Sequence, residues 1–209
     1  FCIQFFYMQK ILSIDLSFVM SPSLHLYEDW ALGTWTDTHT QWEMLNSKMG
    51  ENPSACPRRE KYLIKIFKKS LSNLQSSDQL KFSRNHLDII DAIGNHSGLE
   101  IDNIDQHHDI FYSEWNKPHD LNDKNWMWFL DKKNQVEEYR WFCNKNSQSY
   151  DFCMPFHCEY CEISDRRSKP MTNPDFIFIC ESPRWVPPYQ RTLFRTMQQL
   201  ANNYFRSRK

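Results

Sequence analysis

Residues 58–74 read RREKYLIKIFKKSLSNL and decide the expected fold, because apolar residues recur in this stretch every three or four positions. That spacing places the apolar side chains on one face of an α-helix and the charged side chains on the other. The apolar positions are Leu63, Ile64, Phe67, Leu71 and Leu74. The stretch therefore predicts an amphipathic helix that packs against a core.

Further segments on the C-terminal side extend this prediction. Residues 77–93 predict a second helix that ends at Gly94, and residues 125–142 predict a third. A last helix follows the prolines at 187–188 and has apolar residues along one side. The best strand candidate is the short run Phe-Ile-Phe-Ile at 176–179. The expected fold class is therefore mainly α, a small helical domain with little β structure.

The chain has 209 residues, which suits one domain with looser segments on its N-terminal side. Residues 1–20 are apolar but interrupted by polar residues, so we expect an apolar N-terminal extension, or alternatively a packed helix, rather than a membrane span. Residues 21–57 contain Trp residues without a steady period and predict an irregular arm. Residues 58–209 are expected to form the helical domain, in which the acidic stretch 100–123 is a surface loop.

Composition narrows the function classes. Lys and Arg number 25 against 26 Asp and Glu, so the net charge of −1 predicts no class of partner. The chain has only 4 Gly and no glycine-rich phosphate loop, which argues against the common nucleotide-binding α/β enzymes. The 7 Cys are an odd number and unevenly distributed, which favours a reducing, intracellular compartment over a disulfide framework.

The strongest local motif is Cys-Glu-Tyr-Cys at 158–161. Two thiolates three residues apart on a turn can hold one zinc ion, and tetrahedral coordination needs two further ligands. The expected ligands of a structural zinc ion are Cys143, Cys153, Cys158 and Cys161. His157 and Cys180 are the substitutes, and free thiols or disulfides are the alternatives to zinc. Residues 143–180 are therefore expected to form a compact, Cys-rich, non-helical knot.

A second cluster reads Asp-Gln-His-His-Asp at 105–109. Histidines next to carboxylates can bind a metal ion for hydrolysis, although the spacing is not that of the zinc peptidases. Adjacent residues on a loop often point apart, so a solvated acidic loop is the simpler interpretation. A metal-dependent hydrolase using His107, His108 and Asp109 is the least favoured function. No nucleophile motif occurs, and we expect a protein that is not an enzyme.

The C-terminal helix is basic and has aromatic residues between its cations. Cations can contact phosphates and aromatic rings can stack on unpaired bases, so RNA or single-stranded DNA is a candidate partner. The candidate binding residues are Arg191, Arg195, Arg206, Arg208 and Lys209. The alternative is that these residues solvate the outer face of a packed helix.

The order of motifs from Lys132-Lys133 through Tyr139-Arg140 to the CxxC and Asp165-Arg166-Arg167 resembles a viral family. It is similar to the C-terminal half of the small nonstructural nuclear phosphoprotein of bocaparvoviruses, which has related accessory proteins in chaphamaparvoviruses. The resemblance covers residues 126–167. The chain departs from the family pattern by a short insertion that includes Cys153, and it lacks the Arg/Ser-rich N-terminal arm.

The resemblance implies a non-enzymatic accessory protein in the nucleus of the infected cell. Such a protein supports viral DNA replication and viral pre-mRNA processing through host RNA 3′-end processing or splicing factors. Cys158 and Cys161 would then shape the fold, and neither a membrane nor a small-molecule substrate is expected. A structural subunit of a larger assembly is the alternative, because 15% of the residues are aromatic and could be buried against neighbours.

Overall fold

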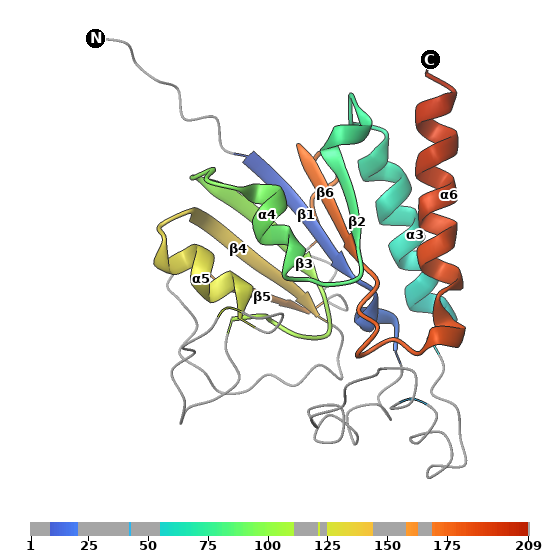
Figure 1. Cartoon of the computed structure of the whole chain (residues 1–209), viewed down its shortest axis with the longest axis horizontal. Helices are drawn as coiled ribbons and strands as arrows, with labels where there is room; N and C mark the ends of the chain where they lie inside the picture. The colour runs from blue at the N-terminus through green and yellow to red at the C-terminus, as the bar shows by residue number, and fades with distance from the viewer. Residues whose placement is uncertain are drawn as a thin grey trace.

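The computed structural model describes residues 9–20, 42, 55–110, 121, 125–143, 158–162 and 169–208, with residues 158–162 described by their backbone only. In this part of the chain the centre of the fold is a six-stranded sheet of order β2-β6-β1-β3-β4-β5 (Figure 1). Every pair of neighbouring strands is parallel. The strands are β1 (Gln9–Asp15), β2 (Leu80–Ser83), β3 (Leu99–Ile104), β4 (Val136–Cys143), β5 (Cys158–Glu162) and β6 (Phe176–Cys180).

Four α-helices and three short 3-10 helices accompany the sheet in the described residues. The α-helices are α3 (Pro57–Leu71), α4 (Asp88–Ile93), α5 (Trp126–Lys132) and α6 (Thr192–Arg206). The 3-10 helices are η1 (Leu16–Val19), η3 (Ser77–Gln79) and η4 (Pro188–Gln190). None of the helices in this part of the chain has the length and the apolar run that crossing a bilayer requires.

The expected mainly α fold with little β structure is wrong, because the core of the molecule is a parallel sheet. The predicted second helix, residues 77–93, divides into β2 and α4. The predicted third helix, residues 125–142, divides into α5 and β4 at Asn134, whose positive φ of 54° interrupts the helix. The apolar spacing in both segments fitted a helix but comes from two shorter elements in succession.

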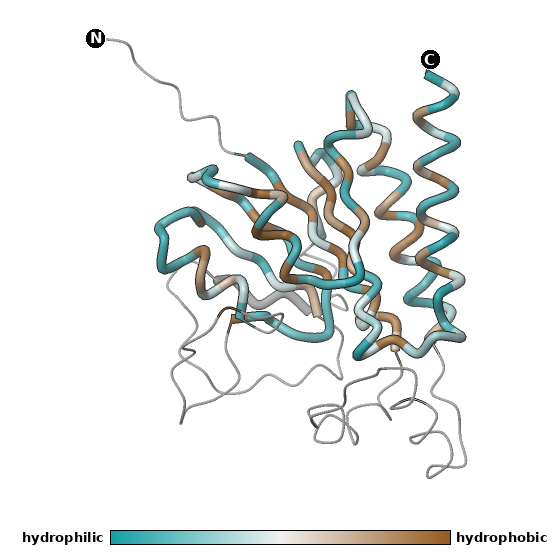
Figure 2. Tube along the Cα trace, in the orientation of Figure 1, coloured by the Kyte–Doolittle hydropathy of each residue, from teal (hydrophilic) through white to brown (hydrophobic). Residues whose placement is uncertain are grey.

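Three elements predicted from the sequence are confirmed. The amphipathic stretch 58–74 corresponds to α3 (Pro57–Leu71), which begins one residue earlier at Pro57, in the first helical turn, where the missing N–H of proline costs nothing. Residues 176–179 lie on β6, and the C-terminal helix is α6. Apolar residues alternate with hydrophilic ones along α6 (Figure 2), as expected for a helix with one buried face.

The sheet has a core on each of its two faces, because side chains alternate along the strands. Leu12, Ile14 and Ile179 belong to the core beneath α3 and α6, which lie side by side (Figure 1). Ile11 and Phe178 belong to the opposite core, with apolar residues of α4 and α5. The molecule therefore has three layers, with the sheet in the middle.

The order in which strands are added to the sheet changes side at β1. After β1 it passes to β2 on one side, crosses to β3 on the other side, and returns with β6 between β1 and β2. Consecutive strands β2 and β3 thus lie on opposite sides of β1. In parallel sheets a crevice opens at the carboxyl ends of the strands at such a switch point, and ligands bind there. Residues 9–15, part of the predicted N-terminal extension, form the strand β1 at this point, and residues 16–19 form η1 directly after it.

Two segments differ from their expected character. The acidic stretch 100–123 is not a surface loop where it is described, since it includes most of β3 and the buried residues Asp105 and Asp109. The Cys-rich stretch 143–180 is not a compact knot in its described part. Cys143 ends β4, residues 158–162 form the edge strand β5, and Cys180 ends β6, with β1 and β3 between β6 and β4.

Candidate metal centre

The carboxyl ends of the central strands bring a group of buried polar residues together. Asp15 is the last residue of β1, Asp105 directly follows β3, and Cys180 is the last residue of β6. His86 lies between β2 and α4, and Asp109 lies four residues beyond Asp105. Each is at most 3% exposed. The strand order, rather than a local motif, makes these residues neighbours.

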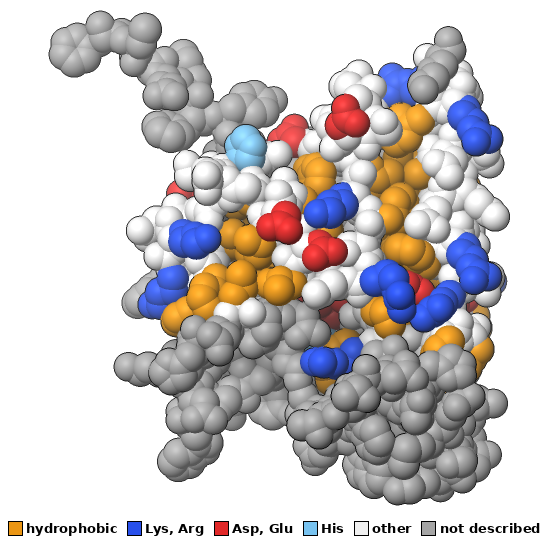
Figure 3. Space-filling model, in the orientation of Figure 1, with side chains coloured by type: hydrophobic (Ala, Val, Ile, Leu, Met, Phe, Trp, Pro, Cys, Tyr) orange, Lys and Arg blue, Asp and Glu red, His pale blue; other side chains and the backbone are white. Residues whose placement is uncertain are grey.

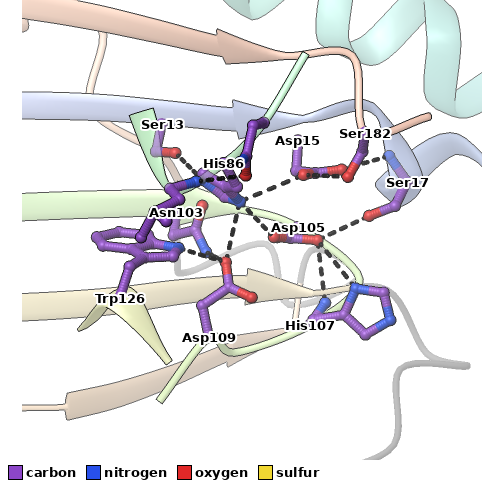
Figure 4. Close-up of polar contacts among 12 residues, drawn as sticks. Ser13, Asp15, Ser17, His86, Asn103, Asp105, His107, Asp109, Trp126 and Ser182 are labelled. Atoms are coloured by element: carbon purple, nitrogen blue, oxygen red, sulfur yellow. Dashed lines mark hydrogen bonds and ion pairs between the residues drawn. The ribbon is translucent and has the colours of Figure 1, made fainter. Parts of the chain in front are cut away.

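Three carboxylates converge on one nitrogen of His86 (Figure 4). Its Nδ1 lies 3.2 Å from Asp15 Oδ2, 3.4 Å from Asp105 Oδ2 and 3.0 Å from Asp109 Oδ2. One ring nitrogen carries at most one proton, so it cannot donate a full hydrogen bond to all three oxygens. The three oxygens therefore surround a point where a positive charge is favoured.

The ring of His86 is fixed from several sides. Its Nε2 lies 2.8 Å from Ser13 Oγ on β1. Phe178 stacks on the ring at a centroid distance of 5.7 Å, and Trp126 lies 5.0 Å away. These contacts direct Nδ1 toward the carboxylates. If Nδ1 is a ligand or an acceptor, Nε2 carries the ring proton and donates a hydrogen bond to the hydroxyl oxygen of Ser13.

Neighbouring donors hold the Asp15 and Asp105 carboxylates in place. Asp15 accepts hydrogen bonds from the backbone N–H of Ser17 at 2.7 Å and from the Ser182 hydroxyl at 2.8 Å. Asp105 accepts from the Ser17 hydroxyl at 2.8 Å and from the backbone N–H of His107 at 3.1 Å. Because Ser17 bonds to both carboxylates, it couples the ends of β1 and β3.

Asp109 is held from the other side of the cluster. The indole Nε1 of Trp126 donates to its Oδ2 at 2.8 Å, and the side-chain amide of Asn103 lies 3.4 Å from the same oxygen. The Oδ1 of Asn103 is buried and has no hydrogen-bond partner among the described residues. Asp109 and Ser182 both have a φ of 54°, an unfavourable backbone for these residues that surrounding contacts must maintain.

The cluster shifts the pKa values of its members in opposite directions. Burial alone would lower the pKa of His86, but the charge of Asp109 and the contacts with the carboxylates raise it well above its usual value. Burial would raise the pKa of Asp105, yet bonds with His107 and His86 hold it well below its usual range. Burial and the charge of Asp105 raise the pKa of Asp109. The shifts of Asp105 and Asp109 in opposite directions show that buried carboxylates this close together ionise jointly only when positive charge accompanies them.

The two adjacent histidines of the 105–109 motif have different places. His107 Nδ1 lies 3.6 Å from Asp105 Oδ1, and its ring packs against Trp185 at 4.4 Å. His108 is buried against Trp141, and its Nδ1 accepts the backbone N–H of Ile110. Burial and the charge of His107 lower the pKa of His108 to about 4. His107 and Asp109 therefore belong to the cluster, whereas His108 packs behind it.

The predicted zinc ligands that the structure describes, Cys143, Cys158 and Cys161, lie on β4 and β5 toward one edge of the sheet. Cys143 is buried at the end of β4, and Cys158 pairs in register with Tyr139 on that strand, as Cys161 does with Phe142. Residues 158–162 form a strand instead of the expected turn. Cys153 and His157 are outside the described residues. A zinc site of Cys143, Cys153, Cys158 and Cys161 stays a prediction.

The residues predicted to contact nucleic acid differ in what they contact within the protein. Arg191 forms an ion pair with Glu181 at 2.8 Å, and Arg208 donates to the carbonyl of Leu74 at 2.7 Å. Arg195 and Arg206 are exposed on α6, and Lys209 is outside the described residues. Basic side chains on the face seen in Figure 3 have acidic side chains among them. Nucleic-acid binding by these residues stays a prediction.

The sequence did not predict the roles of Asp15, His86 and Ser13. A signal was present, because three apolar runs end in polar residues: ILSID at 11–15, LEIDNID at 99–105 and FIFICES at 176–182. If these runs are parallel strands, their polar ends meet at one edge of the sheet. His86 follows only a short, partly buried strand, and its position requires the strand order.

Comparisons with known proteins identify no relative. No protein-family model matches the chain, and searches of curated proteins and of solved structures returned no match.

Proposed function

We propose that this protein is a divalent-metal-dependent hydrolase whose ligands include Asp15, His86, Asp105 and Asp109. The observation that carries the proposal is the convergence of three buried carboxylate oxygens within 3.4 Å of one imidazole nitrogen. The location supports it, since this cluster lies at the carboxyl ends of a parallel sheet where the strand order changes direction.

The distances from His86 Nδ1 to the three carboxylate oxygens are those expected between neighbouring ligand atoms of a metal ion. Ligand atoms about 2.1 Å from an octahedral ion lie roughly 3 Å from their neighbours in the shell. The separations from His86 Nδ1 to the carboxylate oxygens are 3.0–3.4 Å, and His107 Nδ1 lies 3.6 Å from Asp105 Oδ1. Small side-chain movements would direct the same atoms at a central ion, with His107 as a further nitrogen ligand.

Charge favours a cation at this point. Up to three negative charges are buried with the imidazole of His86 and the nearby ring of His107. Buried ions are strongly unfavourable unless they are paired or coordinate a metal. A divalent ion would neutralise two of the carboxylates and allow His86 to act as a neutral ligand. Mixed carboxylate and imidazole donors suit Mn²⁺, Fe²⁺, Co²⁺ or Zn²⁺ better than Mg²⁺.

The chain's own residues would prepare the site for hydrolysis. A bound divalent ion activates a water molecule and polarises the bond that this water attacks. Ser17, Trp126 and Ser13 orient the ligands by the hydrogen bonds described above. Asn103 Oδ1 offers a buried acceptor next to Asp109 that can orient a water molecule. His107 is the most exposed of these groups, with a side chain 12% exposed, so we expect a substrate to approach the site from its side.

The test combines metal analysis with an activity screen of the full chain. We expect Mn²⁺-, Co²⁺- or Zn²⁺-loaded protein to hydrolyse at least one member of a panel of amides, esters, guanidines and phosphoesters. Asp105→Asn keeps the size of the side chain and should abolish the activity. Asp91→Asn, an exposed acid on α4, is the matched control and should retain it. Wild-type protein that binds none of these ions, or activity that persists in Asp105→Asn, would contradict the proposal.

The expectation that the protein is not an enzyme rests on the lack of nucleophile motifs in the sequence, and it stays untested. Hydrolysis by a metal-activated water needs no such motif, so this lack does not exclude the proposed activity. The roles in viral replication and pre-mRNA processing, the nuclear location and the host partners are untested and stay predictions.

A further inference from the structure

A thiol lies beside the proposed metal ligands. Cys180 at the end of β6 pairs in register with Asp15 at the end of β1, so the two side chains project from the same face of the sheet. Ligand atoms of Asp15, His86 and Cys180 all lie within 4.8 Å of one another. Asp105 and Asp109 form a second such group with His86. His86 is thus common to two sets of donors, one of oxygen and nitrogen and one that also contains sulfur.

The place of Cys180 differs from that of an ordinary core cysteine. Cys143 is equally buried but ends β4, beyond β3, and belongs to neither group of donors. Cys180 is directed to the polar end of the sheet, with Asp15 on the neighbouring strand and Ser182 two residues ahead. An apolar side chain of similar size would fill the same volume without a donor atom. The sulfur therefore adds a soft ligand to a set of hard ones.

We propose that Cys180 is a metal ligand and that Asp15, His86 and the Cys180 thiolate together bind Zn²⁺ or Co²⁺. This inference rests on the proposed function and specifies its metal. When the sulfur–metal bond forms, the thiol releases its proton to water. Thiolate ligands select zinc and other thiophilic ions, whereas carboxylate ligands alone suit Mg²⁺ and Mn²⁺. The thiolate thus makes the site selective for zinc over manganese.

Cobalt is the probe, because a thiolate bound to Co²⁺ adds a near-ultraviolet charge-transfer band to the visible bands of the ion. The full chain carries Cys158→Ser and Cys161→Ser, which remove the CxxC as a source of the band. This background protein is titrated with Co²⁺. We expect the charge-transfer band to appear in this background and to disappear when Cys180→Ser is added. Cys56→Ser is the control, since Cys56 is half-buried at the start of α3, and it should keep the band.

A second measurement does not depend on the Cys180 variant folding. X-ray absorption of the zinc-loaded background protein should show one sulfur at about 2.3 Å beside oxygen or nitrogen ligands at about 2.0–2.1 Å. We also expect Cys180→Ser to weaken Zn²⁺ binding by roughly tenfold or more and to change Mn²⁺ binding little.

The outcomes separate this inference from the proposed function. Visible cobalt bands without charge transfer, or zinc with only oxygen and nitrogen ligands, would overturn the role of Cys180 and leave the proposed metal centre in place. A charge-transfer band that persists in Cys180→Ser would overturn it as well. If Mn²⁺ binds but Co²⁺ and Zn²⁺ do not, this inference fails and the proposed metal centre stays in place. If none of the three ions binds, the proposed function and this inference both fail.

Discussion

Asp15 and Cys180 are register partners at the carboxyl ends of adjacent parallel strands, although one lies near the beginning of the described chain and the other near its end. Asp105 follows the strand on the other side of β1, so the same edge receives residues from three separate regions of the sequence. The proposed centre is consequently a product of topology. Its integrity depends on the sheet as a whole, which makes metal binding and folding stability interdependent.

Metal binding should stabilise the fold. An ion at 100 times its dissociation constant adds about 2.7 kcal/mol, which raises the melting temperature by roughly 5–10 °C for a chain of this size. Asp109→Asn should lose this stabilisation, because it removes one of the charges that face the ion. Thermal denaturation with and without Zn²⁺ measures the shift. Asp91→Asn is the control, and Zn²⁺ should raise its melting temperature as much as that of the wild type. An equal shift in Asp109→Asn would exclude Asp109 as a ligand.

Ser13 should control the affinity of the centre without touching the metal. Ser13→Ala removes the hydrogen bond to His86 Nε2 and leaves the ring less well oriented. Loss of such a supporting contact typically weakens metal binding about 10–100-fold. Isothermal titration with Zn²⁺ measures the effect. Ser70→Ala removes a buried hydroxyl from α3 on the other side of the sheet and should leave the affinity unchanged. Equal affinities in the two variants would contradict the role of Ser13.

The Arg140–Asp102 pair should give a pH-dependent contribution to stability. Arg140 donates two hydrogen bonds to the buried Asp102, at 2.7 and 2.8 Å. Arg140→Met leaves that carboxylate without its cation and should lower the free energy of unfolding by about 2–4 kcal/mol at neutral pH. The loss should be at the lower end of this range, because the Arg140 side chain is 27% exposed.

The direction of the pH effect follows from Asp102. Burial raises its pKa to about 6 from the ordinary 3.8, despite the opposing charge of Arg140. Ionisation of Asp102 therefore lowers the free energy of unfolding as the pH rises from about 4 to about 6. Without Arg140 the loss of stability on ionisation is larger. The gap between wild type and Arg140→Met should be widest above pH 6 and narrowest below pH 4. Urea denaturation across this range tests it, and Asp102→Asn/Arg140→Met should lose the pH dependence of the gap.

Two arginines of the predicted nucleic-acid surface should differ in their effect on stability. Arg208 bonds to the Leu74 carbonyl and to the hydroxyl of Tyr204, both at 2.7 Å, and so ties the end of α6 to the chain beyond α3. Arg208→Ala should cost about 0.5–1.5 kcal/mol. Arg195→Ala, at an exposed position of the same helix, should cost little. Urea denaturation distinguishes them, and equal costs would contradict a structural role for Arg208.

Local patterns were sufficient to predict some elements and insufficient for others. The helix α3 and the strand β6 have continuous signals, an amphipathic period in one and an unbroken apolar run in the other. Residues 125–142 contain apolar positions that satisfy a helical period over their whole length. The left-handed turn at Asn134 divides them, and an Asn within a polar stretch gives little warning of this.

Local sequence patterns predict the candidate site even less completely than the secondary structure. His107 and Asp109 belong to a recognisable motif that permits a metal-dependent function. Adjacent polar residues on a loop usually point into solvent, which makes such a function the least favoured from the sequence, whereas this loop is buried at the end of β3. Asp15 and His86 reach the same point only through the strand order. Pairings between distant strands cannot be derived from the periodicity of one segment.

The insertion of β6 between β1 and β2 has a consequence for synthesis on the ribosome. Both neighbours of β6 emerge early, and their facing edges stay without a partner until residues 176–180 are translated. Exposed strand edges recruit other chains, so nascent or prematurely terminated polypeptides would be prone to aggregate and to need chaperones. Translation of β6 and the residues that directly follow it is thus the event that both closes this part of the sheet and delivers Cys180 and Ser182 to the site.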